Sequence, residues 1–351
     1  MRALVLAGGE GSRLRPITHT SAKQLIPIAG APIVYHALEA IAEAGIREVG
    51  VVVGHTGDEV RDAIGDGARW GLEVTYIEQD APRGLAHAVL AAADFVRGQP
   101  FLMYLGDNVI LEGVARFVRG FEAARPDAQI FVARVPEPER FGVVEVRGDT
   151  AVRVVEKPTA FVSDLALVGV YLFDDSIVEA CAALQPSGRG ELEITEAIQS
   201  LIDAGRTVRV EMLDGWWKDT GKPDDLLEAN RMMLSRLCPR LDGTVDAATT
   251  LEGAVAIGDG AQVRDSHLVG PVVIGAGCVI EDSTVGPDVS MEPGCRIVGS
   301  TVTDAVLMQG CEVTGVAGLT ASILGRGVVV RHGAGATHRL VVGDQSLIEV
   351  D

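Results

Sequence analysis

Up to about residue 235, apolar runs alternate with segments whose apolar residues recur at helical spacing. The runs predict buried strands at 2–7, 48–54, 73–79 and 101–107. The segments between them predict helices at 32–45, 58–67 and 84–96. Strands that alternate with helices are typical of a mostly parallel sheet covered on both faces. We therefore predict an α/β, Rossmann-like fold for this part of the chain.

Glycine or polar residues follow three of the predicted strands. Gly8 and Gly9 follow the first strand, Gln79 lies at the end of the third, and Asp107 ends the fourth. Because ligands of such sheets sit beyond the carboxyl ends of the strands, these residues are expected to share one crevice.

A last helix is predicted at 222–238, with Pro223 in its first turn and Pro239 after its end. Soon after it the composition changes, and glycine, valine and short polar residues replace the helical patterns. We therefore predict two domains, residues 1–238 and residues 239–351.

The second domain repeats a six-residue pattern of an apolar residue, a glycine, small or polar residues and an apolar residue again. The clearest copies are IGDGAQV at 257–263, IGAGCVI at 274–280 and VGPDVSM at 285–291. This spacing is typical of a parallel β-helix, whose stacked coils bury a column of aliphatic side chains. The pattern weakens after about residue 300, and a β-sandwich with irregular strands is the alternative.

Composition limits the partners and the compartment. A formal net charge of −19 argues against nucleic acid or an anionic membrane surface, although a basic pocket inside an acidic body stays compatible with it. No apolar run is long enough to span a membrane, and the N-terminal residues lack the pattern of a signal peptide. The five cysteines are odd in number and include no CxxC, so we expect free thiols and a cytoplasmic location.

The glycine-rich segment GGEGSR at 8–13 indicates an anion site. It lacks the Lys-Ser/Thr end of a P-loop, and Leu14 stands where a dinucleotide fingerprint needs its third glycine. On glycines alone, a structural turn and a phosphate site are equally compatible. Arg13 and Arg15 favour phosphate, and Lys23 lies within reach of the same loop. A nucleoside triphosphate would satisfy all of these groups.

Two carboxylates and one lysine fit the same chemistry. Asp107 ends a strand and Asp219 lies beside two tryptophans, and if both faced the triphosphate their oxygens would suit Mg²⁺. Either one can equally be a turn residue. Lys157, in Glu-Lys-Pro after a strand, would be explained by a second anionic group.

With these motifs the chain resembles the sugar-1-phosphate nucleotidyltransferase family, and within it the long-form glucose-1-phosphate thymidylyltransferases. The resemblance rests on LAGGEGSRLRPIT, KQLIPIAGAPIVYHAL, EQDAPRGLAHAV, YLGDN, PERFGVVE, EKP, GVYLFD, GELEIT and WWKDTG, which follow one another along the chain. It implies a C-terminal left-handed β-helix, in agreement with the hexads.

The resemblance also implies roles for individual residues. Catalytic roles would fall to Arg13 on the departing pyrophosphate, Lys23 near the α-phosphate and Lys157 on the sugar phosphate. The residues implied to bind the nucleotide are Gly8, Gly9, Gly11, Ser12, Gln24, Gln79 and Gly84, with Gln79 pairing its amide with the thymine edge. The residues implied to line the sugar are Gly142, Glu156, Lys157, Leu167, Tyr171 and Trp217. Asp107 and Asp219 would hold Mg²⁺.

The implied reaction transfers a nucleotidyl group from dTTP to α-D-glucose 1-phosphate, and the implied state is a homo-oligomer assembled partly through the β-helix. Phe141 stands where the family commonly has Tyr, which leaves the sugar preference open. UTP or another nucleotide could replace dTTP. A bifunctional enzyme with an acetyltransferase in the β-helix, with His267, His332 and His338 as candidate bases, is a second possibility. A non-catalytic sugar-nucleotide sensor is a third.

Overall fold

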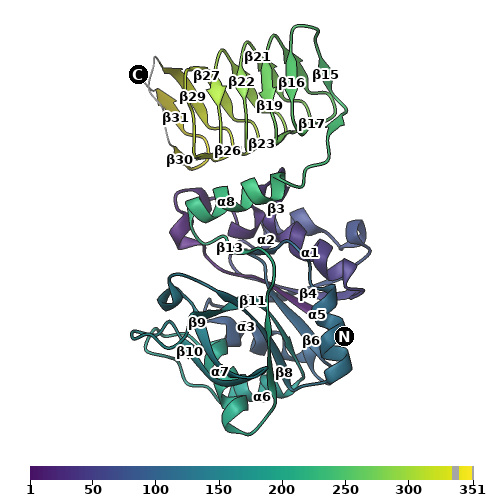
Figure 1. The fold of residues 1–351 in the computed structure, drawn as a ribbon, viewed down its shortest axis with the longest axis vertical. Coiled ribbons are helices and arrows are strands. Elements are labelled where there is room, and N and C mark those ends of the chain that lie inside the picture. Colours follow the sequence, from purple (N-terminus) through teal and green to yellow (C-terminus); the bar gives the residue numbers. More distant parts are fainter. Residues whose placement is uncertain (334–339, 350–351) are drawn as a thin grey trace. The chain divides into compact units, whose positions relative to one another are not determined.

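The computed structural model describes residues 1–333 and 340–349. These residues form two compact units (Figure 1), one made of residues 1–10 and 34–219 and the other of residues 11–33 and the chain from Thr220 onward. Each unit is described by itself. Among the described residues, no helix combines the length and the apolar composition that a membrane span needs.

A nine-stranded sheet forms the centre of the first unit. Its order is β5 (Glu73–Glu78), β4 (Glu48–Val53), β1 (Arg2–Ala7), β6 (Phe101–Leu105), β11 (Leu165–Phe173), β8 (Ala128–Arg134), β12 (Val208–Met212), β10 (Thr150–Glu156) and β9 (Gly142–Arg147). The first four strands are parallel neighbours, as predicted from their apolar runs. From β11 onward most pairs are antiparallel, an arrangement that the sequence did not predict.

The helices of this unit are α1 (Ile33–Glu43), α2 (Gly57–Ile64), α3 (Leu85–Ala91), α4 (Ala93–Val96), α5 (Ala115–Ala124), α6 (Ser176–Ala182) and α7 (Ile194–Asp203). Short 3₁₀ turns lie at Ala68–Trp70 and Pro138–Arg140. Buried side chains of β1, β6, β8 and β11 pack with α3, α6 and α7 into one apolar core. Two short strands outside the sheet, β7 (Asn108–Ile110) and β13 (Trp217–Asp219), pair antiparallel with each other.

The second unit begins with 3₁₀ turns at Ser12–Leu14, Ile17–His19 and Lys23–Leu25 and a small hairpin of β2 (Pro27–Ile28) and β3 (Ala31–Pro32). After a gap in the sequence it continues with α8 (Pro223–Leu234), which starts at the predicted proline. The remaining described residues are a stack of parallel strands, as Figure 1 shows.

These strands form three sheets. The first holds β14 (Arg240–Leu241), β17 (Val255–Ile257), β20 (Val272–Ile274), β23 (Val289–Met291), β26 (Ala305–Leu307), β28 (Ser322–Leu324) and β30 (Val341–Val342). The second holds β15 (Thr244–Val245), β18 (Gln262–Arg264), β21 (Val279–Glu281), β24 (Arg296–Val298), β27 (Glu312–Val316), β29 (Val329–Gly333) and β31 (Leu347–Glu349). The third holds β16 (Thr250–Glu252), β19 (His267–Val269), β22 (Thr284–Val285) and β25 (Thr301–Val302).

The three sheets are the faces of a parallel β-helix, so the hexad prediction is confirmed. Stacking puts like residues above one another and fills the interior with aliphatic side chains. It also builds a ladder at one corner, where the N–H of Ser283 donates to the hydroxyl oxygen of Ser266, 17 residues earlier, over 3.1 Å. At another corner the buried thiols of Cys278, Cys295 and Cys311 each donate to a backbone carbonyl. The coils continue past residue 300, where the sequence pattern had weakened.

Candidate active site

Two glycines without side chains, Gly8 and Gly54, let the carboxyl ends of β1, β4 and β5 approach one another closely. A Cβ at Gly8 would lie 3.0 Å from Gln79 Oε1 and 3.3 Å from the backbone nitrogen of Gly54. A Cβ at Gly54 would lie only 2.8 Å from the carbonyl oxygen of Gly8. Any larger residue at these two positions would push the strand ends apart, so the glycines let Gln79 reach from β5 toward β1. Gly8 and Gln79 therefore meet at one edge of the sheet, as expected from the sequence, and Gly9 follows Gly8 on the exposed side.

Gly84, at the start of α3, is required by the fold itself. Its φ is 103°, and a Cβ would lie 2.4 Å from the carbonyl oxygen of Leu192. The N–H of Leu192 donates to the carbonyl of Arg83 over 2.7 Å, and the N–H of Ala86 donates to the carbonyl of Leu192 over 3.1 Å. The loop that follows Gln79 is thus bonded to the GELEIT segment at residues 190–195, a contact that the sequence did not reveal.

The two predicted metal carboxylates lie at the paired strands β7 and β13, with Asp219 at the end of β13 and Asp107 directly before β7. Asp219 pairs with Asn108 across the ladder, and Asp107 directly precedes Asn108. The amide of buried Asn108 donates to Asp107 over 2.8 Å, and its oxygen accepts a hydrogen bond of 2.6 Å from the indole nitrogen of Trp217. The sequence analysis did not predict a role for Asn108. In the structure it hydrogen-bonds to Asp107 and pairs with Asp219, so it contacts both carboxylate residues.

The phenol of Tyr171 on β11 is affected by the charges of these two carboxylates and of Glu156. Its pKa is raised above the ordinary value, first by burial of the phenol and then by the negative charges of Glu156, Asp107 and Asp219. These three carboxylates therefore all act electrostatically on one buried phenol. Carboxylate oxygens are the hard ligands that Mg²⁺ prefers, so Asp107 and Asp219 fit that ion. Among the described residues no group of three or more histidine, cysteine or acidic side chains could hold a metal.

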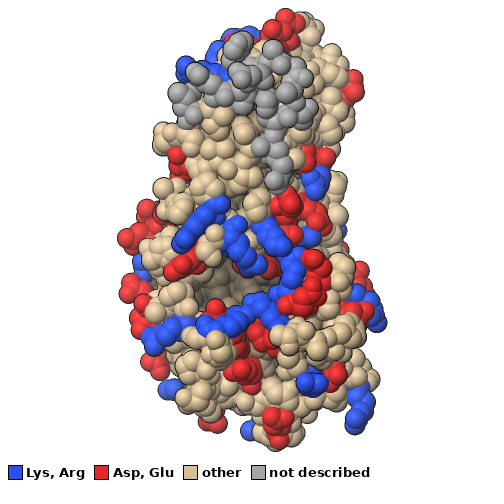
Figure 2. Space-filling model, turned by 90° about the vertical axis from the view of Figure 1, so that its left-hand side faces the viewer, with Lys and Arg blue, Asp and Glu red and all other residues tan. Residues whose placement is uncertain are grey.

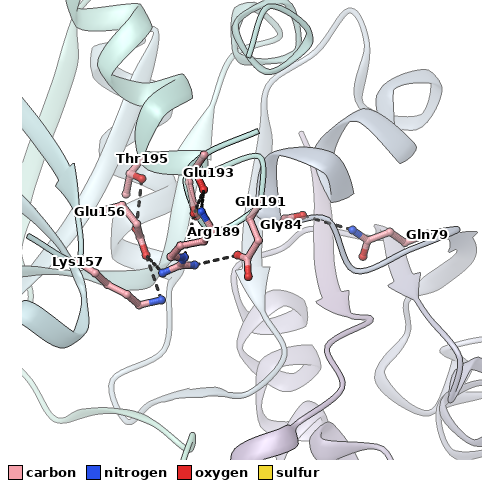
Figure 3. Close-up of polar contacts among 9 residues, drawn as sticks. Gln79, Gly84, Glu156, Lys157, Arg189, Glu191, Glu193 and Thr195 are labelled. Carbon is pink, nitrogen blue, oxygen red and sulfur yellow. Dashed lines mark hydrogen bonds and ion pairs between the residues drawn. The ribbon is translucent and has the colours of Figure 1, made fainter. Parts of the chain in front are cut away.

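Glu156 is held by three neighbours (Figure 3). The hydroxyl of Thr195 donates to its Oε2 over 3.2 Å. The ammonium of Lys157 lies 3.2 Å from its Oε1, and a guanidinium nitrogen of Arg189 lies 3.4 Å from the same oxygen. Lys157 has a φ of 39°, in the left-handed region that lysine seldom adopts, and such backbone outliers cluster at functional sites.

Arg189 was not predicted, although it directly precedes the GELEIT motif. Besides Glu156 it contacts Glu191 over 2.9 Å and Glu193 over 3.2 Å. The pKa of Glu193 is raised, chiefly by burial of its carboxyl. Three carboxylates thus hold one cation beside the predicted sugar residues. The placement of arginine immediately before one of the motifs that carry the family resemblance was the available signal.

Gly142 and Leu167, two of the other predicted sugar residues, lie close to Glu156. A Cβ at Gly142 would lie 2.7 Å from Thr195 Cγ2, 3.1 Å from Glu156 Oε2 and 3.1 Å from Leu167 Cδ1. The glycine therefore leaves open the space in front of Glu156. Trp217 lies next to Phe141, with ring centroids 5.7 Å apart.

The remaining predicted residues belong to the second unit and are grouped within it. Gly11 has a φ of 62°, and a Cβ there would lie 2.9 Å from Thr18 Cγ2 and 3.0 Å from Lys23 Cβ. The hydroxyl of Thr18 donates to the carbonyl of Gly11 over 2.7 Å, which ties the start of this loop to its middle. Ser12 follows Gly11 in the first 3₁₀ turn.

Arg13 packs closely against Gly221, where a Cβ would lie 3.0 Å from the guanidinium. Lys23 and Gln24 are buried, with 5% and 2% exposure. Within the described chain the buried Oε1 of Gln24 accepts no hydrogen bond, which leaves an acceptor for a donor from outside the chain.

Figure 2 shows many Lys and Arg side chains on one face of the molecule, among Asp and Glu side chains. The whole chain has a formal net charge of −19, so these cations are set against an acidic body. They are compatible with the basic pocket that the sequence left open.

The histidines considered for a second activity in the β-helix form no described site. His267 Nε2 lies 3.0 Å from Glu252 on the neighbouring coil, as part of an exposed cross-strand pair. His338 lies outside the described residues, as does the side chain of His332. The described residues therefore give the acetyltransferase hypothesis no support.

Comparison with known proteins agrees with this geometry. The sequence profile of the nucleotidyl transferase family matches residues 2–236. The chain is 52% identical to a glucose-1-phosphate thymidylyltransferase of Streptomyces griseus, over 100% of this chain and 99% of the relative. It is 50% identical to a glucose-1-phosphate thymidylyltransferase of Streptomyces antibioticus, with the same coverage.

A crystal structure from Bacillus anthracis, described as that of a glucose-1-phosphate thymidylyltransferase in complex with sucrose, is similar in fold. Its TM-score is 0.63 at 33% identity, and the match covers 66% of this chain and 94% of the other. The likeness in sequence covers the residues that carry the candidate site.

Proposed function

Since the chain belongs to the nucleotidyl transferase family and is a nucleotidyltransferase, we propose that its nucleotidyl donor is dTTP and its acceptor is α-D-glucose 1-phosphate. The products are dTDP-glucose and pyrophosphate. The full-length identity of 52% to a glucose-1-phosphate thymidylyltransferase is the observation that carries this choice of substrates. The pairing of Lys157 with Glu156 beside an open glycine adds a structural reason, because together they offer a cation for phosphate and an acceptor for hydroxyls.

The proposed step is one displacement at phosphorus. A phosphate oxygen of the sugar 1-phosphate attacks the α-phosphorus of dTTP and forms a new P–O bond. The bond from the α-phosphorus to the bridging oxygen breaks, and its electron pair leaves with pyrophosphate. Because the attacking oxygen is already an anion, no general base is needed. The barrier comes mainly from repulsion between two polyanions and from charge at phosphorus, so positioning and electrostatics carry the catalysis.

On the donor side, separate residues bind the triphosphate and the base. Gly8, Gly9, Gly11 and Ser12 bind the triphosphate, and Arg13 neutralises the departing pyrophosphate. Buried Lys23 lies near the α-phosphate. The base is bound by Gln24, Gln79 and Gly84.

On the acceptor side, Lys157 binds the sugar phosphate, and Glu156 accepts hydrogen bonds from sugar hydroxyls. We add Arg189 to this group because its guanidinium lies beside Glu156, where a second cation would help to hold the phosphate. The residues that line the sugar are Gly142, Leu167, Tyr171 and Trp217.

Mg²⁺ would be held by Asp107 and Asp219, whose oxygens suit it, and it would supply positive charge to the phosphates. In the described structure Asn108 orients Asp107 and pairs with Asp219. The chain holds the two carboxylate residues at a short antiparallel pair of strands, which the hydrogen bond from Trp217 to Asn108 also joins.

A substrate panel tests the proposal. The full chain with Mg²⁺ is assayed for pyrophosphate release with dTTP, UTP, CTP, GTP and ATP, each combined with glucose 1-phosphate, galactose 1-phosphate and N-acetylglucosamine 1-phosphate. We expect the highest kcat/KM for dTTP with glucose 1-phosphate. A higher kcat/KM for UTP would replace dTTP as donor, and a purine preference would defeat the pyrimidine assignment. Binding of dTTP without turnover on any acceptor would favour the sensor hypothesis.

Three further proposals concern the whole protein. The catalytic domain is residues 1–238 and the β-helix domain is residues 239–351. The β-helix, expected to be left-handed, contributes to a homo-oligomer, which light scattering of the full chain would detect. The free cysteines support a cytoplasmic location.

A further inference from the structure

The loop at residues 11–23, which we call the triphosphate loop, belongs to the same compact unit as the β-helix. It holds Arg13 and Lys23, the two cations proposed to meet the nucleotide. Residues 24–33 continue it into the hairpin of β2 and β3, within that unit. The contacts between this part of the chain and the β-helix can therefore be read as contacts inside one unit.

Asp344, in the turn between β30 and β31, joins the β-helix to the triphosphate loop. Its Oδ2 accepts a hydrogen bond of 2.7 Å from the hydroxyl of Thr20. Its Oδ1 accepts one of 2.7 Å from the backbone N–H of Arg326, on the neighbouring coil. The N–H of Gln345 donates in turn to the carbonyl of Arg326 over 2.7 Å. The β-helix therefore holds one oxygen of this carboxylate in place, and the other oxygen is a fixed acceptor for the loop.

Gly343, next to Asp344, lets the same coil approach the backbone of the loop. A Cβ at residue 343 would lie 3.1 Å from the carbonyl oxygen of Pro16 and 3.3 Å from its Cβ. That carbonyl accepts a hydrogen bond of 3.1 Å from the N–H of His19, which closes the 3₁₀ turn at Ile17–His19. Two adjacent residues of the β-helix thus contact Pro16 and Thr20, the residues on either side of this turn.

The 3₁₀ turn is in contact with both ends of the triphosphate loop. The hydroxyl of Thr18 donates to the carbonyl of Gly11 over 2.7 Å. A Cβ at Gly11 would lie 2.9 Å from Cγ2 of Thr18 and 3.0 Å from Cβ of Lys23, so glycine lets these three residues meet. Gly11 also has a φ of 62°, in the left-handed region, where the chain turns into Ser12 and Arg13. A shift of the turn would therefore also move Arg13 and Lys23.

The hairpin that follows the loop is held by the same unit. A Cβ at Gly30 would lie 2.8 Å from Cγ1 of Val273 on β20, and the N–H of Ala29 donates to Asn230 on α8 over 2.8 Å. The segment is thus anchored at two places, residues 16–20 and residues 29–30, and Lys23 lies between them.

We propose that Thr20 and Asp344 are positioning residues, through which the β-helix holds the triphosphate loop in the shape that binds the nucleotide. The inference rests on the proposed function, in which Arg13 and Lys23 meet the triphosphate. A loop that is ordered before binding loses less conformational entropy when the ligand arrives, so pre-organisation raises affinity. The β-helix thus takes part in nucleotide binding, in addition to its proposed part in assembly.

Five variants of the full chain test the proposal. Thr20→Val removes the donor at nearly constant volume, Thr20→Ser keeps it, and Asp344→Ala removes the acceptor. A double variant combines Thr20→Val with Asp344→Ala. Thr249→Val is the matched control, because the hydroxyl of Thr249 also donates to an aspartate, Asp246, over 2.7 Å, with both residues in the β-helix. The measured quantities are kcat and KM for dTTP at saturating glucose 1-phosphate, and KM for glucose 1-phosphate at saturating dTTP.

We expect Thr20→Val and Asp344→Ala to raise KM for dTTP about fivefold or more and to leave KM for glucose 1-phosphate within about twofold. Thr20→Ser should keep KM for dTTP within about twofold of the starting protein, since the donor remains. The double variant should be no weaker than Asp344→Ala, because both changes remove one interaction. Thr249→Val should change neither constant.

Three kinetic results would overturn the proposal. The first is an active Thr20→Val protein with an unchanged KM for dTTP. The second is an equal rise of that KM in Thr249→Val, which would indicate a general effect of losing a hydroxyl. The third is a double variant in which the losses of the two single variants simply add, since Thr20 and Asp344 would then act separately.

A second readout does not depend on activity. In the ligand-free protein, hydrogen exchange of residues 11–25, measured by mass spectrometry, reports on the backbone N–H groups of Leu14, His19 and Leu25, which are hydrogen-bonded within this segment. Thr20→Val should speed their exchange, and Thr249→Val should not. If the chain used no nucleotide at all, the proposed function would fail, and faster exchange in Thr20→Val would still support the positioning role. Equal exchange in Thr20→Val and the starting protein would refute that role, whatever the activity.

Discussion

The side-chain oxygen of Asn230 accepts a hydrogen bond of 2.8 Å from the backbone N–H of Ala29, although 201 positions separate the two residues. The same oxygen accepts from the hydroxyl of Ser290 over 2.8 Å, and the amide nitrogen donates to the carbonyl of Asp288 over 3.1 Å. Asn230 is fully buried on α8, so one side chain joins the β2–β3 hairpin to strand β23 of the β-helix. In the same unit, the hydroxyl of Thr20 donates to Asp344 over 2.7 Å.

Replacing this asparagine should destabilise the second unit. Asn230→Leu leaves the N–H of Ala29, the hydroxyl of Ser290 and the carbonyl of Asp288 without their partner in a buried place, and we expect a loss of about 3 kcal/mol in the free energy of unfolding. Urea titration followed by circular dichroism measures it. Ser290→Ala removes only one of the donors and should cost about 1 kcal/mol. Equal stability of Asn230→Leu and the starting protein would contradict the bridging role.

Lys157 should be needed for turnover. We expect Lys157→Ala to lower kcat about 100-fold or more, because a fixed cation near the reacting phosphates is lost. Arg153→Ala is the matched control on β10, the strand that ends just before Lys157, since Arg153 is exposed and lies 3.8 Å from Glu145. Steady-state pyrophosphate release compares the two variants, and near-normal kcat for Lys157→Ala would remove the residue from the mechanism.

Asp107 should control the metal requirement. Asp107→Ala should reduce turnover about 100-fold or more and raise the Mg²⁺ concentration that gives half-maximal rate, because one of two hard ligands is gone. Chelation of Mg²⁺ should stop the reaction of the starting protein, and added Mg²⁺ should restore it. The exposed Asp94, paired only with Arg97 at 3.4 Å among the described contacts, provides the control Asp94→Ala. An unaltered Mg²⁺ dependence in Asp107→Ala would argue against a metal role.

Gly142 should determine access to the acceptor pocket. Gly142→Ala places a methyl group 2.7 Å from Thr195 and 3.1 Å from Glu156, so Thr195 or Glu156 must move. We expect KM for glucose 1-phosphate to rise about tenfold, with little change in KM for dTTP. At Gly120, on α5, an added Cβ would meet its nearest neighbour only at 3.9 Å, so Gly120→Ala should leave both constants unchanged. A parallel rise of both KM values in Gly142→Ala would indicate general damage.

The thiols should differ sharply in reactivity. Burial raises the pKa of Cys181 to about 12, and the pKa of Cys278 is raised by its hydrogen bond with Cys295 and by burial. Since the thiolate is the reactive form, these groups stay protonated and inert at pH 8, whereas exposed Cys238 is accessible to reagent. A colorimetric thiol assay should find one reactive cysteine in the native chain and all five after denaturation. Rapid reaction of several native thiols would show that the β-helix interior opens.

The local pattern was sufficient to predict several strands of the first unit and the β-helix of the second. The apolar runs predicted β1, β4, β5 and β6, and the hexads predicted the β-helix, because both signals depend on residues close in sequence. Parallel strands bring their carboxyl ends to one edge, so the meeting of Gly8 and Gln79 followed from the same pattern.

Tertiary structure alone decided which side chains meet across long separations. Arg189 reaches Glu156 over 33 positions, and Trp217 donates to Asn108 over 109. The antiparallel half of the sheet, the link from Leu192 to Gly84 and the bridge at Asn230 have no local signature either. Hydrophobic periodicity indicates which face of a segment is buried. The hydrogen-bond partner of a buried polar atom depends instead on how the whole chain packs. For that reason the sequence could only propose residues for a site, while the partner of each polar side chain, such as Asn108 for the indole of Trp217, came only from the folded chain.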